Sequence, residues 1–191
     1  MDIATLSLVA VAAIIIFLLV QFLRRDLDKR DQTTRLRDQF GSEYQRAVNK
    51  QGDQEQAEDE LANRLLHAKS LDLLPLTDDQ KADFRREWQL LETQFVRDPA
   101  GVLREADHMI KKVMGAKGYP TESFEKMAED LSVDYPDHVE NYRNLHILAT
   151  RAEYETISRD ATQQALQRCR VLFEELLDSD VTESTILRER T

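Results

Sequence analysis

Residues 77–95 read TDDQKADFRREWQLLETQF, and this stretch carries the strongest amphipathic pattern in the chain. Its large apolar side chains recur at spacings of 4, 3 and 4, which places Phe84, Trp88, Leu91 and Phe95 on one helical face. Thr77 and Gln80 form a Thr-x-x-Gln capping box, which predicts that the helix begins after Thr77. Burial stabilises a large apolar side chain by about 1.5–3 kcal/mol, so we expect this face to pack against other helices.

A second helix is predicted to follow at once. Asp98 is a good N-cap and Pro99 fits the first helical position. The residues expected to face the core are Val102, Leu103, Ala106, Met109, Ile110 and Val113. This helix is expected to end near Gly115 or Gly118, where glycine at the C-terminus and a following proline break the chain.

Three more helices complete the predicted bundle. Thr121 is expected to cap the first of them. The second is expected to start at Asp134 or Pro136, and the third at Ser158 or Asp160. The expected core positions are Phe124, Met127, Ala128 and Leu131, then Val139, Tyr142, His146 and Ala149, and finally Ala165, Cys169, Leu172, Phe173, Leu176 and Leu177. Short connections favour antiparallel neighbours, so residues 77–178 are predicted to form a small all-α bundle, followed by a flexible tail at residues 179–191.

Residues 24–76 are predicted to be a charged, helical juxtamembrane linker. A sparse apolar stripe includes Phe40, Tyr44 and Val48, which lie four residues apart on one face of a helix that Gly41 would weaken. A second helix is predicted over residues 54–70. Residues 71–76 should be extended, because Pro75 disfavours helix at the residue before it, and we place the domain boundary there.

Residues 3–23 form a long apolar segment whose only polar side chains are Thr5, Ser7 and Gln21. A helix of this length rises about 31 Å, which is the thickness of a bilayer hydrocarbon core. The alternative is a cleaved secretory signal, which has a basic start, a shorter apolar core and a small-residue cleavage site. Asp2 precedes this segment and residues 17–20 offer no such site, so we predict an uncleaved transmembrane anchor over residues 1–23.

Basic residues follow the predicted anchor and none precede it. Arg24, Arg25, Lys29 and Arg30 form this basic collar. The positive-inside rule therefore predicts a single-pass protein of the cell membrane, with the bulk of the chain in the cytoplasm. The collar could also bind anionic lipid headgroups.

The net charge of −10 is unevenly distributed. Residues 24–50 hold eight Lys and Arg against five Asp and Glu, whereas residues 51–191 hold eighteen against thirty. An acidic body repels phosphate backbones and suits basic protein partners, so we expect another protein and membrane lipid as partners, and no nucleic acid. The apolar stripe at Phe40 could also pair two copies, but it is too short to identify a coiled coil, and the oligomeric state stays open.

No catalytic or cofactor motif stands out. The histidines, His67, His108, His138 and His146, form no His-Glu-x-x-His pair, and the one cysteine has no second cysteine for a zinc site. The five glycines form neither a phosphate-binding loop nor a dinucleotide fingerprint. We therefore expect no metal, no cofactor and no enzymatic activity, and we interpret His146 as a half-buried core residue.

Two further features have a structural interpretation. The carboxylates Asp130, Asp134, Asp137 and Glu140 could suggest a divalent-cation site, but their spacing does not fit an EF-hand, and the last three suit a helix N-terminus. Cys169 lies on a core-facing stripe and is predicted to be a small buried residue, because the sequence marks no base to activate it.

A set of short motifs runs through most of the chain from about Phe40 onward. It comprises Trp88, Gln94-Phe95-Val96, Asp98-Pro99, Ala106-Asp107, Val113-Met114, Gly118-Tyr119-Pro120, Asp130-Leu131-Ser132-Val133-Asp134, Pro136, Glu140-Asn141-Tyr142-Arg143 and Leu172-Phe173-Glu174-Glu175-Leu176-Leu177. This combination resembles an uncharacterised bacterial family of N-terminally membrane-anchored helical proteins, although Tyr135 and Cys169 depart from its pattern. The resemblance implies a bacterial membrane protein and implies no activity.

These observations lead to one hypothesis and two alternatives. The hypothesis is a membrane-tethered helical module that binds another protein, as a scaffold or a local regulator. One alternative is a helical domain that is exported and stays anchored, or is released, on the extracytoplasmic side. The other is an enzyme with an unrecognised site, which would need a ligand bound in a cavity of the bundle.

Overall fold

The computed structural model describes residues 17, 19, 21 and 29–179 and divides the chain into two units, residues 1–39 and 40–191. In the first unit residues 29–39 are helical. The predicted anchor falls almost entirely outside the described residues, and within those residues we find no helix with the length and apolarity to cross a bilayer. Of the predicted tail at residues 179–191, all but Ser179 also lies outside them.

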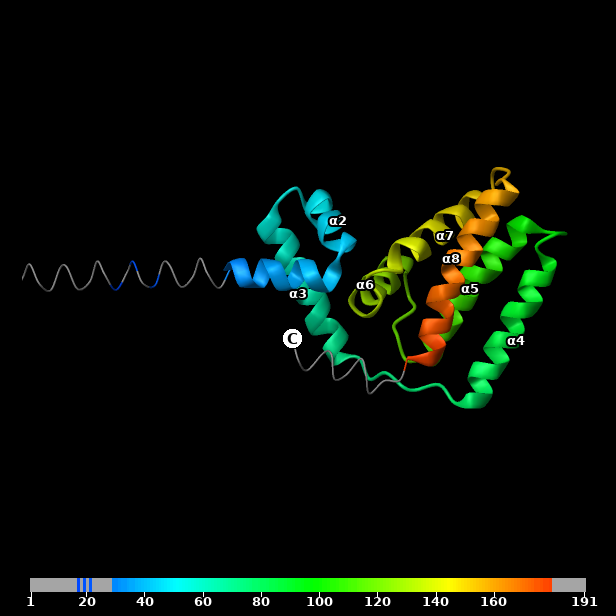
Figure 1. The fold of residues 1–191 in the computed structure, drawn as a ribbon, viewed down its shortest axis with the longest axis horizontal. Coiled ribbons are helices and arrows are strands. Elements are labelled where there is room, and N and C mark those ends of the chain that lie inside the picture. The colour runs from blue at the N-terminus through cyan, green and yellow to red at the C-terminus, as the bar shows by residue number, and fades with distance from the viewer. Residues whose placement is uncertain (1–16, 18, 20, 22–28, 180–191) are drawn as a thin grey trace, which may run out of the picture. The chain divides into compact units, whose positions relative to one another are not determined.

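The second unit contains helices joined by turns and extended connectors, with no strand among residues 40–179 (Figure 1). Its helices are α2 (Ser42–Gln51), α3 (Gln54–Ser70), α4 (Asp78–Gln94), α5 (Pro99–Ala116), α6 (Phe124–Asp134), α7 (Val139–Arg151) and α8 (Arg159–Asp178). The all-α prediction is therefore confirmed for the part of the chain that the structure describes.

Side-chain caps explain where most of these helices begin. The Thr77 hydroxyl accepts a hydrogen bond from the Gln80 backbone N–H, and the Gln80 side chain completes the predicted capping box. Asp98 caps α5 in front of Pro99, and Ser158 caps α8. Each cap satisfies a backbone N–H that has no partner within the helix.

Two predicted helix starts were wrong. Ser123, and not Thr121, caps α6, because its hydroxyl accepts a hydrogen bond of 3.2 Å from the Lys126 N–H. The start of α7 lies at Val139, after both Asp134 and Pro136, because a turn comes first, in which the His138 N–H donates to the Tyr135 carbonyl. Asp134 accordingly ends α6 and does not open α7.

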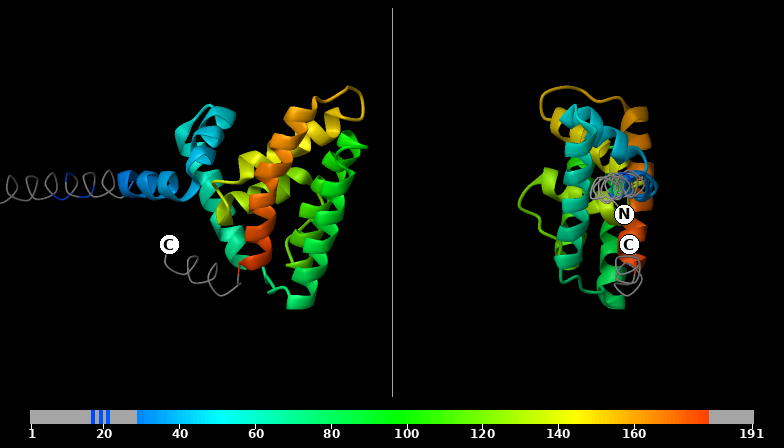
Figure 2. Two further views of the ribbon diagram at one scale, coloured as in Figure 1. Left: turned by 45° about the vertical axis from the view of Figure 1, so that its right-hand side comes forward. Right: turned by 90° about the vertical axis from the view of Figure 1, so that its left-hand side faces the viewer.

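The core of the bundle is continuous and apolar. Helix α5 lies at its centre and contacts α4, α7 and α8 (Figures 1 and 2). Nearly all of the predicted core positions are buried, and the exceptions, Phe95, Phe124 and His146, are partly exposed. Trp88 is 1% exposed and its ring stacks on Phe173, with 4.4 Å between the ring centroids.

Residues 40–76 belong to the same compact unit as the bundle, whereas the sequence predicted a linker there. The connector at residues 71–76 is extended as predicted, but Leu73 and Leu76 are buried in the bundle core. The Leu74 N–H donates to the Lys117 carbonyl at 2.9 Å, which fixes the connector to the end of α5. Burial of Leu73 and Leu76 therefore joins the predicted linker to the bundle.

Helices α2 and α3 form an antiparallel pair ahead of this connector. Gly41 has a φ of 51° and separates residue 40 from α2, so the predicted stripe of Phe40, Tyr44 and Val48 does not follow one helix. Asp53 caps α3, whose bounds agree with the predicted second helix. The two helices pack on each other, and α3 also contacts α6.

Candidate functional site

The strongest candidate site is a groove between α4 and α8. These helices run antiparallel, because Arg85 pairs with Glu174 at 2.9 Å and, nearer the α4 C-terminus, Glu92 pairs with Arg170. Both helices pack on α5, and the contact between them depends on side chains that reach across, including the stacked Trp88 ring.

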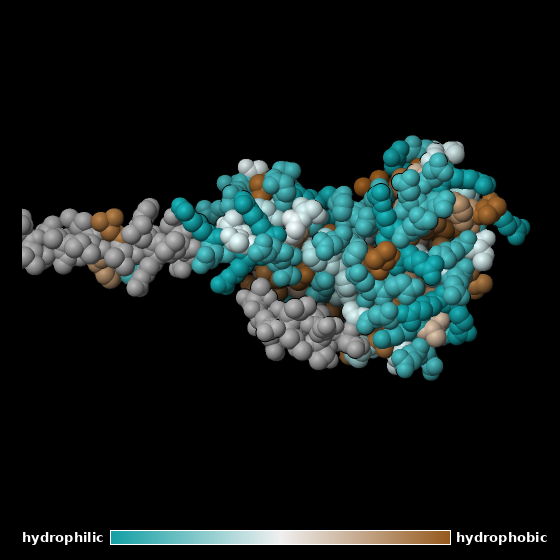
Figure 3. Space-filling view, in the orientation of Figure 1, coloured by the Kyte–Doolittle hydropathy of each residue, from teal (hydrophilic) through white to brown (hydrophobic). Residues whose placement is uncertain are grey.

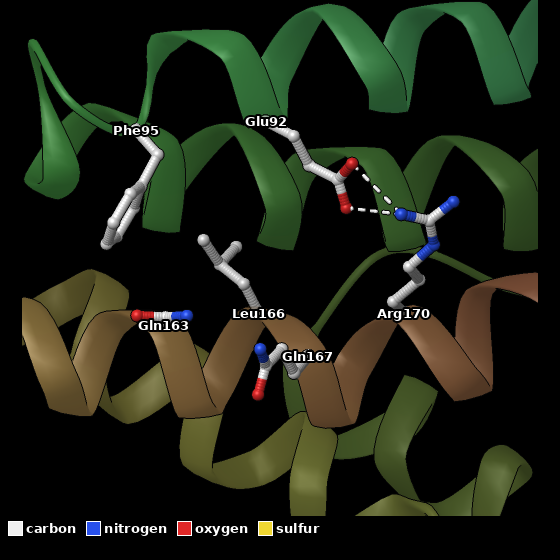
Figure 4. A pocket seen from close by; sticks show the side chains of 6 residues that line it. All are labelled: Glu92, Phe95, Gln163, Leu166, Gln167 and Arg170. Carbon is white, nitrogen blue, oxygen red and sulfur yellow. Dashed lines mark hydrogen bonds and ion pairs between the residues drawn. The ribbon is translucent and has the colours of Figure 1, made fainter.

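The groove lies at the C-terminal end of α4, opposite the first half of α8 (Figure 4). It has a volume of about 320 Å³ and is open to solvent. Phe95 from the end of α4 and Leu166 from α8 are its apolar walls, and Gln163 and Gln167 flank Leu166 on the α8 side. This volume is at the lower end of the range for ligand pockets, about 300–1,000 Å³.

A polar contact closes one end of the groove. Arg170 donates to both carboxylate oxygens of Glu92, at 2.7 and 2.9 Å, and Glu92 also accepts from the Trp88 indole N–H at 2.9 Å. The lining residues of α8 run from Gln163 to Arg170, so the groove is about 10 Å long. One turn before Gln163, the Arg159 guanidinium donates to the Val96 carbonyl at 3.0 Å.

The chemistry of the groove suits the binding of an apolar side chain. Its charged groups, Glu92 and Arg170, neutralise each other, and the two glutamine amides can donate to and accept from a peptide backbone. Hydrophilic residues cover most of the face that Figure 3 shows, and apolar residues form only small separate patches there. A short apolar slot in such a surface selects a few anchor residues and does not bind a broad apolar face.

Sequence reasoning missed this groove for two reasons. Phe95 was assigned to the core, although it lies at the C-cap of α4, where the helix no longer covers it. Leu166 was not assigned a role, because the predicted core face of α8 was drawn through its neighbour Ala165 and through Cys169. Its side chain is 7% exposed and packs with the core cluster.

A cluster of buried charges lies where α2 and α3 meet α6 and α7. Glu43 is 2% exposed and accepts hydrogen bonds from Arg143 at 2.9 and 3.3 Å. Arg64 lies 3.6 Å from the same carboxylate, donates to Ser132 at 3.1 Å and pairs with Glu60. Although burial opposes ionisation of Glu60, its hydrogen bonds with Gln51 and Arg64 hold the pKa of this carboxyl below its usual value.

Sequence reasoning also missed this cluster, although a signal was present. Arg64 shares a helical face with Ala57, Leu61 and Ala68, at spacings of 4, 3 and 4, and all of them are buried. A basic residue on such a face is a candidate for a buried ion pair. Its acidic partner, Glu43, comes from the preceding helix and could not be assigned from spacing.

The histidines lie apart from one another. The His146 ring stacks on Phe124 with 3.7 Å between centroids and its Nδ1 lies 3.1 Å from Asp107, which agrees with the predicted half-buried core role. His67 lies 3.4 Å from Asp130, His138 lies 3.0 Å from Glu175, and His108 is exposed. Within residues 29–179 no group of three or more His, Cys, Asp or Glu side chains is placed to hold a metal ion.

The four carboxylates of the suggested cation site have separate partners or positions. Asp130 faces His67 and Lys126, Asp134 accepts a hydrogen bond of 2.6 Å from Tyr119, and Glu140 lies 3.4 Å from Arg46. Asp137 lies in the turn just before α7. The prediction that Asp134 lies at a helix N-terminus was wrong, since it is the last residue of α6.

Cys169 is a buried core residue, as predicted. Its side chain is fully buried and its thiol donates to the Asn141 carbonyl at 3.3 Å. Burial, together with the nearby Asp107 carboxylate, raises the pKa of this thiol far above its usual value. A thiol held in its neutral form is a poor nucleophile.

Half of the predicted basic collar can be located. Lys29 and Arg30 are exposed at the start of the helical residues 29–39, whereas Arg24 and Arg25 lie outside the described residues. Lipid binding by the collar stays a prediction.

Comparison of the chain with protein-family models, with curated proteins and with solved structures finds no match in any of the three. The resemblance to a bacterial family of anchored helical proteins therefore stays a prediction from the sequence motifs.

Proposed function

We propose that this chain is a membrane-tethered module that binds a segment of another protein in the groove between α4 and α8. The observation that carries the proposal is the groove itself, with the apolar walls Phe95 and Leu166 beside the paired Glu92 and Arg170. Its charged groups are paired with each other and its amides are of a kind that binds peptide backbone. A scaffold or local regulator would use such a site to hold its partner near the membrane.

The partner that fits is a short segment with one or two apolar anchor residues flanked by Lys or Arg. A groove of about 10 Å accommodates about two turns of helix or about three extended residues. The preference for basic flanks comes from the charge of the chain, since residues 51–191 hold thirty acidic against eighteen basic side chains. Small contacts of this size correspond to a weak or transient interaction, which a membrane tether can strengthen by raising the local concentration.

The tether itself is proposed from the sequence. The apolar residues 3–23 and the basic residues that follow them favour a single span with the bundle in the cytoplasm. A compartment-specific reporter fused after Thr191 tests this directly. A signal from the cytoplasm alone supports the proposal, and a signal from the far side of the membrane favours the exported alternative.

Groove binding can be tested with the detergent-solubilised full-length chain and two synthetic peptides. One is an amphipathic Leu/Lys peptide, and the other has the same sequence with Ser in place of each Leu. We expect the Leu/Lys peptide to bind and the Ser version to lose at least about tenfold in affinity, because each lost apolar anchor removes about 1.5–3 kcal/mol of burial. Fluorescence anisotropy of the labelled peptides measures both affinities.

Two tryptophan substitutions locate the binding site. Gln167→Trp fills the groove and should abolish peptide binding. Gln164→Trp adds the same bulk to an exposed position of α8 that does not line the groove, and should leave binding unchanged. Equal effects of the two variants, or equal binding of the Leu and Ser peptides, would contradict the proposal.

A further inference from the structure

The contact between α3 and α6 buries a carboxylate with incomplete pairing. The Asp130 side chain is 1% exposed, and its Oδ1 lies 3.4 Å from His67 Nε2 and 3.3 Å from Lys126 Nζ. Its Oδ2 has no hydrogen-bond partner within residues 29–179, and neither has the buried Nε2 of His67. Since ionised carboxylates are costly to bury without full pairing, the protonation of this pair affects how firmly α3 packs on α6.

Apart from His67 and Lys126, the charged groups at this contact bind other partners or have only a weak effect on Asp130. Glu129 from α6 adds a second negative charge near Asp130. Arg64 from α3 is bound to Ser132 and Glu60 and lies beside Glu43, and the Arg143 side chain of α7 is bound to Glu43. His67 is therefore the group from the α2–α3 pair that faces Asp130 most directly.

Protonation of Asp130 favours the packed arrangement, because it removes the buried charge that His67 and Lys126 compensate only in part. Burial is the main cause that raises the pKa of the Asp130 carboxyl, and Lys126 and His67 only partly oppose it. A carboxyl whose pKa is raised by packing stabilises that packing below its ordinary pKa, and this contribution is lost as the pH rises through the raised value.

We propose that the His67–Asp130 pair is a proton-operated latch, which holds the α2–α3 pair against α6 and α7 when it carries a proton and loosens as the pH rises. The α2–α3 pair lies in the chain between the predicted anchor and the bundle. Release of the α2–α3 pair would therefore lengthen the connection between the predicted anchor and the bundle. The latch is independent of the groove, which lies between α4 and α8, so it can be present whether or not the groove binds a peptide.

Hydrogen exchange of the full-length chain in detergent micelles tests the latch. Protection factors for the amides of α3, corrected for the intrinsic pH dependence of exchange, are measured from pH 5 to pH 8. We expect the protection of α3 to fall by about three- to tenfold over this range, since the packed state holds up to one additional proton. The protection of α5 and α8 reports whether the bundle itself stays folded.

Three substitutions make the test specific. Asp130→Asn removes the buried charge and should leave the protection of α3 within about twofold across the whole range, whereas His67→Gln keeps the buried carboxyl and should keep the fall of protection with pH. Asp107→Asn is the matched control, because Asp107 also faces a histidine, His146, but is a quarter exposed and lies on α5. This variant should keep the wild-type pH dependence of α3.

Several results would overturn the latch. One is a wild-type profile that changes by less than twofold, and another is an Asp130→Asn profile with the full wild-type change. Flattening of the profile by Asp107→Asn to the same degree would show a general electrostatic effect. If Asp130→Asn lowers the protection of α5 and α8, its fold is disturbed, and a flat profile in His67→Gln, which keeps the buried carboxyl, would then overturn the latch.

Discussion

The bundle of α4–α8 and the pair of α2 and α3 are held in place by different kinds of contact. The bundle shares one apolar core, which extends from Leu73 in the connector to Leu177 near the end of α8. The pair also buries apolar residues, including Tyr44 and Leu61, but these lie outside that core. Its contact with α6 and α7 includes the buried charges of Glu43, Arg64, Arg143 and Asp130.

This difference implies different responses to change. Apolar burial is non-directional and roughly additive in area, so the bundle should resist changes of pH and salt. Buried ion pairs contribute little net stability while complete, but the removal of one partner leaves a charge without compensation. The pair should therefore open as a separate, less stable unit, while the bundle stays folded.

The largest effect is expected from Trp88→Ala in the bundle. The indole is 1% exposed, stacks on Phe173 and donates to Glu92, so its removal leaves a cavity and an unpaired contact. We expect the free energy of unfolding to fall by about 3–5 kcal/mol. Urea unfolding of the full chain in micelles, followed by circular dichroism, measures the change.

The matched control for Trp88 is Leu90→Ala on the same helix. Leu90 is 63% exposed, and its substitution should change the free energy of unfolding by no more than about 0.5 kcal/mol. A loss confined to α3 on substitution of Trp88, with α5 and α8 still protected from exchange, would contradict the idea of one shared bundle core.

Glu43→Gln is the corresponding change in the α2–α3 pair. It removes the carboxylate that Arg143 and Arg64 share, and we expect the packing of the pair to lose about 3 kcal/mol. In contrast to the Trp88 variant, the loss should appear in hydrogen exchange of α2 and α3 and leave α5 and α8 unchanged. Glu140→Gln is the control, since this carboxylate also pairs with an arginine but is exposed, and little change is expected there.

The same contrast explains what the sequence could and could not predict. Local signals act within a few residues, so the capping box of Thr77, the Asp98-Pro99 start and the aromatic face of α4 were predicted correctly. The bounds of α3 also agree with the helix predicted over residues 54–70. Helix starts failed where a competing local bond decided the outcome, as at Ser123.

Contacts between distant residues were not predictable in this way. Glu43 and Arg143 are 100 residues apart, and their side chains meet only because the packing of the helices between them brings them together. The groove depends on the place where α4 ends opposite Leu166, which is a property of two helices together. For this reason the polar residues 24–76 were assigned to a linker, although residues 40–76 belong to the same compact unit as the bundle.

Gly118 tests how the connector joins the pair to the bundle. It has a φ of 92°, and a Cβ there would lie 2.9 Å from the backbone oxygen of Asp72. Gly118→Ala should therefore cost about 2 kcal/mol, from backbone strain together with the displacement of the connector. Gly52→Ala has a similar φ, 71°, but meets nothing within 4 Å, so about 1 kcal/mol is expected from strain alone.

Thermal unfolding of both glycine variants provides the measurement. The Gly118 variant should also weaken the protection of α3, because the added Cβ displaces the connector that follows α3. Equal destabilisation by the two variants would mean that the approach of Asp72 to Gly118 contributes nothing to stability.

The smallest effects come from the helix caps, and they compare the two regions with the same chemistry. Thr77 caps α4 in the bundle, and Asp53 caps α3 in the pair, where its carboxylate accepts from the Gln56 N–H at 2.9 Å. Each change to Ala should cost about 1 kcal/mol locally.

Thr77→Ala should lower the free energy of unfolding of the whole bundle by that amount, since α4 unfolds with the shared core. Asp53→Ala should lower only the protection of α2 and α3, by about fivefold, and leave the unfolding of the bundle unchanged. Identical profiles for the two variants would show that pair and bundle unfold as one unit, and the contrast between apolar and charged packing would then have no consequence for stability.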